Sequence, residues 1–339
     1  MTNRAALLTA PGTVELVDRA QPAAPGPGEV LVAPAAVGIC GSDIHYLLGD
    51  DPRYRFPRVL GHELIATVRA AGAGVGVAVG QQVAVWPLQA CGDCGACEAD
   101  RPNACPNFSL IGVHCDGGLQ DALLVPETQC FPIEGEPALM TLAEPLSVAI
   151  HAVARGEVGD QAVVVLGAGP IGLLIGFVAT GIGARVLIVD RLESRLKLAR
   201  RLGMETVSAD SSTVTRARGW AGGDGPPVVF DATASPAAVD DALSLVRSAG
   251  RLVLVGLPGE RAQMGFGVVT HKELDVLGSS CCTAAEFAEA VDLVQRRGED
   301  LRPLITGEVP LVDAGEALRR VAERPAESVK VVIRVGDEA

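Results

Sequence analysis

The stretch 162–190 constrains the fold more than any other part of the sequence, because its features occur in the order of one supersecondary unit. An apolar run, AVVVL, is followed by the glycines of GAGPIG, then by an apolar helical segment and a second apolar run. The first glycine permits a tight turn, the second lets a pyrophosphate approach the backbone, and the third lets helix and strand pack closely. The unit predicts a dinucleotide site whose turn consists of Gly167, Gly169, Pro170, Ile171 and Gly172.

Asp190 closes the second apolar run and favours NAD over NADP. Its carboxylate is placed to accept hydrogen bonds from the adenosine ribose hydroxyls, and its charge would repel a 2′-phosphate. Arg191 follows directly and leaves dual cofactor use open, while Arg195 either covers the adenine or is an exposed helix arginine. The alternative for the whole unit is a glycine turn in an α/β sheet without cofactor.

The length of 339 residues predicts two domains. Short β-branched runs broken by Gly, Pro and Asp indicate an all-β region in residues 1–148. Apolar strands alternate with helical segments in residues 149–282, which is typical of a doubly wound α/β domain with a parallel sheet. Two amphipathic helices follow, and the closing run SVKVVIRV is expected to return residues 283–339 to the first domain.

The charge balance argues against two classes of partner. With 28 basic and 41 acidic residues the formal net charge is −13, which would repel nucleic acid and an anionic membrane surface. The start of the sequence has no apolar stretch of signal-peptide length, and no window suggests a bilayer-spanning helix. We therefore expect a cytoplasmic protein with a small-molecule substrate, no nucleic acid and no membrane.

Four of the nine cysteines form a compact motif. Cys91, Cys94, Cys97 and Cys105 have the spacing C-x2-C-x2-C-x7-C within a loop rich in Gly, Asp and Pro. Four thiolates so close in sequence can surround one tetrahedral zinc ion with no open position, as in structural zinc sites. A nucleic-acid-binding zinc ribbon is the alternative, and the neighbouring acidic residues and the overall charge oppose it.

A second set of candidate metal ligands is dispersed along the chain: Cys40, His62, Glu63 and Glu144. Soft and borderline ligands from separate loops suit a catalytic zinc ion, which needs few protein ligands and keeps one position open. Each residue also has an ordinary explanation, since a lone cysteine is usually a small buried hydrophobe.

The sequence resembles the medium-chain dehydrogenase/reductase superfamily, and within it the sorbitol dehydrogenase branch. The resemblance spans essentially the whole chain, and its most specific segments are VGICGSDIHY at 37–46, PRVLGHE at 57–63, the cysteine motif, AEPLSVAIHA at 143–152 and VLGAGPIGLL at 165–174. It implies a GroES-like β-barrel catalytic domain followed by a Rossmann coenzyme domain.

The resemblance also implies roles for individual residues. Cys40, His62 and Glu63 would bind the catalytic zinc, with Glu144 as a direct or water-mediated ligand. Ser42 and His45 would form a proton relay, and Tyr46 would line the polyol pocket. The alternative for His45 is a surface histidine. His114 and His151 are expected to be structural, and Asp43 to be a turn or helix-cap residue.

The activity implied is oxidation of a secondary hydroxyl of a polyol or sugar by NAD, with two zinc ions per chain. A sugar-acid (aldonate) 5-dehydrogenase or an L-threonine 3-dehydrogenase is the alternative within the family, and IGVHCDGG at 111–118 resembles the sugar-acid side. Outside enzymes, the alternative is an NAD-binding relative without chemistry.

The chain departs from related polyol enzymes where these often have an arginine-containing stretch, because it has GSSCCTAAEF with Cys281 and Cys282. This departure leaves the substrate open. The run ELDVLGSS at 273–280 is expected to pair with a second copy in a dimer or tetramer.

Overall fold

The computed structural model describes residues 2–50, 54–256 and 264–336, which form two compact units. The first unit consists of Met1–Glu144 and Thr283–Ala339, and the second of Pro145–Cys282. The boundary thus falls inside a helix, α4 (Ala143–Arg155), whose first turn carries Glu144. Each unit is described separately below.

The second unit contains a parallel sheet with the strand order β13-β12-β11-β14-β15-β16 in the described residues. This order, in which the direction of winding reverses between β11 and β14, is that of a doubly wound dinucleotide-binding sheet. Its four inner strands are mostly buried apolar runs: β11 (Ala162–Leu166), β12 (Arg185–Asp190), β14 (Val228–Asp231) and β15 (Arg251–Leu254). The edge strands are β13 (Glu205–Ser208) and β16 (Asp275–Gly278), which are partly exposed. The predicted fold class is therefore confirmed for this unit.

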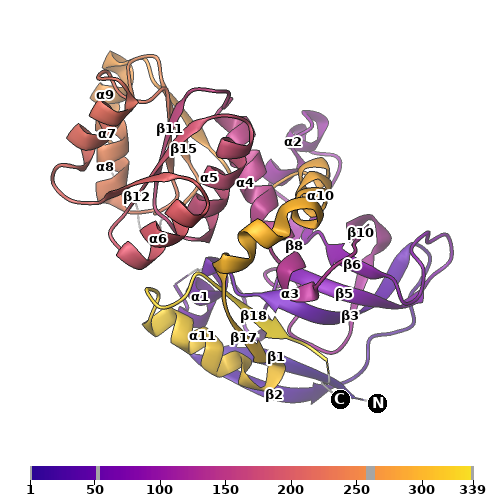
Figure 1. The fold of residues 1–339 in the computed structure, drawn as a ribbon. Coiled ribbons are helices and arrows are strands. Elements are labelled where there is room, and N and C mark those ends of the chain that lie inside the picture. The colour runs from indigo at the N-terminus through magenta and orange to yellow at the C-terminus, as the bar shows by residue number, and fades with distance from the viewer. Residues whose placement is uncertain (1, 51–53, 257–263, 337–339) are drawn as a thin grey trace. The chain divides into compact units, whose positions relative to one another are not determined.

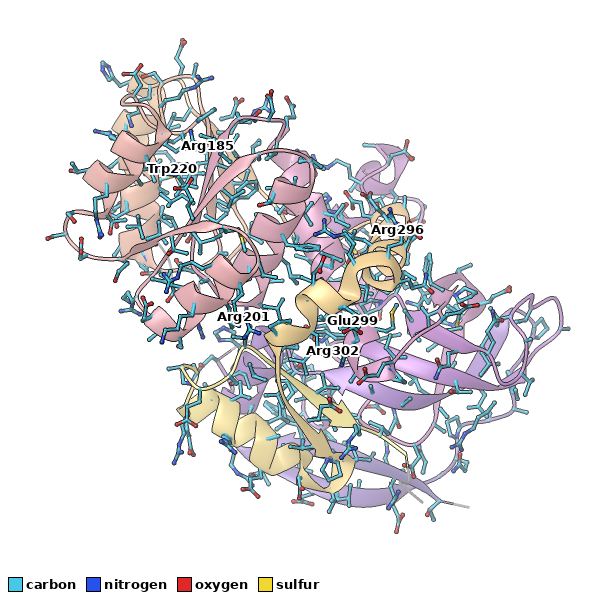
Figure 2. All side chains as sticks on the ribbon, viewed as in Figure 1. Arg185, Arg201, Trp220, Arg296, Glu299 and Arg302 are labelled. Atoms are coloured by element: carbon cyan, nitrogen blue, oxygen red, sulfur yellow. The ribbon has the colours of Figure 1, made fainter. Side chains whose placement is uncertain are left out.

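Helices cover both faces of this sheet (Figure 1). Contacts of α5 and α6 with β11–β13 form one layer, and contacts of α7 and α8 with β11, β13 and β14 form the other. After α4, the helices of the second unit are α5 (Pro170–Gly181), α6 (Glu193–Arg201), α7 (Thr213–Ala221), α8 (Pro236–Leu245) and α9 (Phe266–His271). At the surface of this layer the guanidinium of Arg185 lies over the ring of Trp220, 4.7 Å from its centre (Figure 2).

The first unit is built mainly from antiparallel sheets. In the described residues its largest sheet has the order β10-β6-β5-β3-β18-β17, with β9 also paired to β3, and a second sheet has the order β2-β1-β4. The strands are β1 (Asn3–Ala10), β2 (Thr13–Arg19), β3 (Glu29–Gly38), β4 (Arg58–Val59), β5 (Glu63–Ala71), β6 (Gln82–Val85), β7 (Leu88–Gln89), β8 (Ser109–Leu110), β9 (Leu123–Pro126), β10 (Cys130–Pro132), β17 (Ile305–Pro310) and β18 (Lys330–Arg334). The closing strand β18 lies between β3 and β17, antiparallel to β3.

The helices of the first unit are α1 (Gly41–Leu48), α2 (Gly95–Glu98), α3 (Pro137–Met140), α10 (Ala284–Leu301) and α11 (Ala314–Glu323). Short 3-10 turns lie at Pro102–Ala104, Glu127–Gln129, Arg302–Leu304 and Leu311–Asp313. Helix α10 begins at a capping box, in which the Thr283 hydroxyl accepts from the Glu286 amide and the Glu286 carboxylate accepts from the Thr283 amide. It ends where Arg302 bonds Glu299 and Glu136 (Figure 2).

The segment Pro137–Arg155 corrects one expectation, that no window suggests a membrane span. By length and composition this helical stretch could cross a bilayer. Most of it is buried inside the fold, as is the case for a core helix.

Candidate active site and cofactor-binding residues

Three of the dispersed candidate ligands meet in the first unit. Ligand atoms of Cys40, His62 and Glu63 all lie within 4.8 Å of one another. The antiparallel pairing of β3 with β5 explains this, because it places Gly38 opposite Glu63 and so brings the end of one strand to the start of the other. A thiol, an imidazole and a carboxylate from separate segments are the donor types of a catalytic zinc ion, so this cluster fits that metal.

Asp43 fixes the surroundings of the histidine in this cluster. One carboxylate oxygen accepts the Cys40 backbone N–H at 2.9 Å, which confirms the expected cap of α1. The other oxygen lies 3.7 Å from His62 Nδ1, and both of these atoms are buried without a hydrogen-bond partner. Burial opposes the charged imidazole, but Asp43 and Cys40 raise the pKa of His62 well above its ordinary value. Sequence reasoning did not predict that Asp43 lies beside His62, and the contact is on the Nδ1 side of the ring.

Glu144 belongs to the same electrostatic neighbourhood. Desolvation raises the pKa of its carboxyl to about 7, against the opposing effect of His62. The charges of Glu63 and Lys330 also act on it, which places Glu144 near the cluster. Among the described residues, the group whose ligand atoms lie within 4.8 Å of one another consists of Cys40, His62 and Glu63 and does not include Glu144.

Lys330 is a site residue that sequence reasoning missed. Its Nζ atom lies 2.5 and 2.6 Å from the two carboxylate oxygens of Glu63 and 3.0 Å from the Ile39 carbonyl oxygen. Lys330 is 1% exposed and Glu63 is 0% exposed. The sequence held one signal for this role: Lys330 lies within an otherwise apolar strand, where burial of an unpaired charge would cost free energy.

The predicted relay residues lie on α1. Ser42 Oγ is 3.5 Å from His62 Nε2, so the hydroxyl faces the metal cluster. His45 is exposed, which is compatible both with proton exchange with solvent and with an ordinary surface histidine. Tyr46 is 6% exposed and stacks on Tyr54 with ring centres 4.4 Å apart, so most of its ring belongs to the core. Its role at a substrate pocket stays a prediction.

The cysteine motif closes into one cluster. The sulfur of Cys94 lies 3.5 Å from that of Cys97, and the sulfur of Cys105 lies 3.4 Å from that of Cys91. All four cysteines are free and their sulfurs lie within 4.8 Å of one another, which fits a tetrahedral zinc ion. The Cys97 backbone N–H lowers the pKa of Cys94 to about 7 and so favours the thiolate that binds metal.

The glycine turn of the second unit has the geometry that a pyrophosphate needs. Gly167 has φ +98°, which favours glycine, and a Cβ atom on Gly172 would lie 1.9 Å from the Gly167 carbonyl oxygen. A Cβ atom on Gly169 would meet nothing within 4 Å, so the space above this residue is open. Pro170 and Ile171 form the first turn of α5, whose N-terminal amides point toward the same end of the sheet.

Asp190 lies at the end of β12 beside this turn. One carboxylate oxygen accepts the Ala168 N–H at 2.7 Å and the other accepts the Leu192 N–H at 2.8 Å, so the side chain is oriented and each oxygen keeps a further lone pair. Arg195 Nη1 lies 3.9 Å from the carboxylate, and Arg191 is exposed. An acid with an arginine beside it fits the adenosine end of a dinucleotide.

The remaining singled-out residues have packing roles. His114 Nδ1 accepts the Leu110 N–H, and His151 is buried within α4. The Ser147 hydroxyl donates to the buried sulfur of Cys282 at 2.9 Å, whereas Cys281 is half-buried with φ +53°.

Two family models match the chain. Residues 26–135 match the alcohol dehydrogenase GroES-like domain, and residues 170–296 match the zinc-binding dehydrogenase domain. The two matches divide the sequence as the two units do, except that the second extends into α10.

Several similar curated proteins are named as dehydrogenases or reductases. An L-galactonate-5-dehydrogenase of Escherichia coli is 35% identical, with 91% of this chain and 92% of that protein covered. An L-threonine 3-dehydrogenase of Saccharopolyspora erythraea is 32% identical over 91% and 92%. A D-xylulose reductase of Saccharomyces cerevisiae is 32% identical over 98% of each chain.

Solved structures agree in fold over almost the whole chain. An E. coli alcohol dehydrogenase in complex with NADH has a TM-score of 0.90 at 30% identity, covering 98% of this chain and 99% of the other. A zinc-binding dehydrogenase of Sinorhizobium meliloti bound to NADP has a TM-score of 0.89 at 31% identity, with the same coverage. The neighbours thus hold either nicotinamide cofactor.

Proposed function

Since the chain belongs to the zinc-type medium-chain alcohol dehydrogenase family, we propose that it oxidises a secondary hydroxyl of a polyol or sugar-derived substrate to a ketone, with NAD as the hydride acceptor. The observation that carries the proposal is the convergence of Cys40, His62 and Glu63 in a chain that also has the glycine turn. The family assignment makes the chain an enzyme, which argues against an NAD-binding relative without chemistry.

The metal would supply a Lewis acid for the substrate oxygen when bound at Cys40 and His62. The residues of the chain then divide the remaining work. Asp43 lies on the Nδ1 side of His62. Ser42, whose hydroxyl faces His62, accepts the substrate hydroxyl proton while it gives up its own. The exposed His45 takes up the proton that Ser42 releases and exchanges it with solvent.

NAD is the proposed cofactor because Asp190 presents a carboxylate where NADP would carry its 2′-phosphate. Arg195 lies 3.9 Å from that carboxylate, and Arg191 follows it in sequence, so their charges would offset part of the repulsion. Measured KM values for NAD and NADP test this. A lower KM for NADP, or an Asp190→Ala variant with unchanged NAD affinity, would contradict the assignment.

Two substrate classes have specific support. The similarity to an L-galactonate-5-dehydrogenase and the IGVHCDGG segment favour a sugar acid, whereas the similarity to a D-xylulose reductase and the EPLSVAIHA segment favour a polyol. L-threonine is the third candidate. Incubation with NAD and a panel of polyols, aldonates and threonine, followed by NADH absorbance, decides among them. Turnover of carboxylated substrates alone would exclude the polyol.

A cysteine variant tests the catalytic site itself. Cys40→Ala should abolish turnover and leave NAD binding intact, because the glycine turn belongs to the other unit. The matched control is Cys115→Ala, which removes an exposed cysteine outside both sulfur-containing clusters and should stay active. Loss of NAD affinity in Cys40→Ala would contradict the assigned separation of roles.

We further infer a cytoplasmic homo-oligomer. Strand β16 is an edge strand of the parallel sheet in the described residues, so a second copy could extend the sheet there. Light scattering distinguishes a dimer from a tetramer, and a monomer at micromolar concentration would contradict the inference.

A further inference from the structure

The Glu63–Lys330 ion pair shares one of its members with the metal cluster. Glu63 lies within 4.8 Å of the Cys40 and His62 ligand atoms, yet both of its carboxylate oxygens contact the Lys330 ammonium group. Both side chains are almost wholly shielded from solvent. A carboxylate in this position has two competing cationic neighbours, the ammonium group and any metal ion bound by Cys40 and His62.

The backbone of β3 is built to permit this pair. Gly38 is the register partner of Glu63 on β5, and a Cβ atom on Gly38 would lie 2.0 Å from Glu63 Oε2. The Glu63 side chain therefore lies across β3 in the space that a side chain at position 38 would fill. Gly38 is also paired with Val332 of β18, the strand that carries Lys330.

The lysine is held on its own side as well. Its Nζ atom donates to the Ile39 carbonyl oxygen, and the Ile39 N–H donates to the Val331 carbonyl oxygen, so β18 is fixed beside the loop that presents Cys40. The ammonium group cannot turn to solvent, because Lys330 is 1% exposed. Its charge therefore stays next to Glu63.

We propose that Lys330, which contacts the Glu63 carboxylate in the gap at Gly38, is a positioning residue that holds this carboxylate back from the catalytic zinc ion and thereby weakens zinc binding at Cys40 and His62. This proposal rests on the proposed function, because it requires a metal at that cluster. Removal of the ammonium group would take a positive charge away from the metal and free Glu63 to become a full ligand. Zinc would then bind more tightly. If Lys330 only supported the local packing, its removal would instead weaken zinc binding.

The test measures zinc release from the purified holoenzyme to a chromogenic chelator. Wild type should show two phases, and the phase missing in Cys40→Ala belongs to the catalytic zinc. In Lys330→Met this phase should slow about tenfold. This is the smallest change in metal affinity that is typical when a group next to a metal ligand is replaced. Glu63→Gln should accelerate it, and the double variant should return close to wild type. Lys272→Met is the matched control, since Lys272 caps backbone carbonyls in the second unit and should leave both phases unchanged.

Lys330→Met leaves the buried Glu63 carboxylate unpaired and could fail to fold. The comparison of Glu63→Gln with Lys330→Met/Glu63→Gln avoids this, because neither variant contains that carboxylate. The double variant should release the catalytic zinc more slowly than Glu63→Gln. Unchanged or faster release in Lys330→Met, or faster release when Lys330 is removed in the Glu63→Gln background, would overturn the proposal while leaving the proposed function intact. A wild-type enzyme with no release phase dependent on Cys40 would overturn both.

Discussion

Lys330 Nζ lies 2.5 Å from one carboxylate oxygen of Glu63 and 2.6 Å from the other, although 267 residues separate the two in sequence. The pair joins the last strand of the chain to the segment that carries His62. Burial disfavours the charged lysine, but Glu63, Cys40 and Glu144 together outweigh this effect and raise the pKa of Lys330. The stability of the first unit should therefore depend on both members being present.

Lys330→Met should destabilise the metal-free first unit by about 3–5 kcal/mol, because it leaves a buried carboxylate without a partner. The double variant Lys330→Met/Glu63→Gln should recover most of that loss. The chain has two tryptophans, and Trp86 belongs to the first unit. Urea unfolding followed by Trp86 fluorescence in a Trp220→Phe background reports on that unit alone. Equal destabilisation of the single and double variants would show that the ion pair is not the cause.

The three glycines of the turn should differ in what they contribute. Gly169→Ala should fold normally, since its added Cβ meets nothing within 4 Å, but should lose about tenfold or more in NADH affinity because the methyl group occupies the approach of the pyrophosphate. Gly172→Ala should instead destabilise the second unit, because its Cβ would lie 1.9 Å from a carbonyl oxygen. NADH fluorescence titration and thermal unfolding separate the two effects. Unchanged NADH affinity in Gly169→Ala would contradict the assigned site.

Metal analysis should find two zinc ions per chain, one at each cluster. Cys94→Ser should retain about one and should lower the thermal midpoint, because the loop that carries α2 loses its cross-link. Its remaining zinc should still depend on Cys40. A Cys94→Ser protein with two zinc ions would contradict the cysteine cluster as a metal site.

Asp231 predicts a pH-dependent stability of the second unit. Burial raises the pKa of its carboxyl above the ordinary value of 3.8, even though the amide and hydroxyl of Thr233 donate to it. A raised pKa means that folding disfavours the ionised form, so the carboxylate lowers stability at neutral pH and this penalty disappears as the pH falls below 3.8. Asp231→Asn removes the charge and keeps an oxygen for both Thr233 donors. It loses the bond that the Ala234 N–H gives the carboxylate, but it should still be more stable than wild type at pH 7.

The measurement is the difference in thermal midpoint between Asp231→Asn and wild type, without cofactor, followed by Trp220 fluorescence. The advantage of the variant should shrink as the pH is lowered through the acidic range. A difference that is constant with pH, or that favours wild type at pH 7, would show that burial does not control this carboxyl.

The local sequence was sufficient for the features whose cause is local. The order of strand, GAGPIG, helix, strand and Asp190 predicts the dinucleotide unit, because each glycine is required by the backbone within a few residues of it. The spacing of Cys91, Cys94, Cys97 and Cys105 predicts a cluster for the same reason, since a short loop cannot separate them widely. The strand-rich region predicted in residues 1–148 and the two amphipathic helices predicted after it are confirmed, the helices as α10 and α11, because their apolar periodicity is also local.

Only the tertiary structure decided which distant groups meet. The alignment of β3 with β5 and β18 places Glu63 over Gly38 and against Lys330, and the cap residue Asp43 also lies 3.7 Å from His62. Nothing in SVKVVIRV identifies the lysine as a partner of a metal-site carboxylate. The physical reason is that strand register and burial, which decide whether a charge must be paired, arise from contacts across hundreds of residues and leave no periodic trace in the sequence.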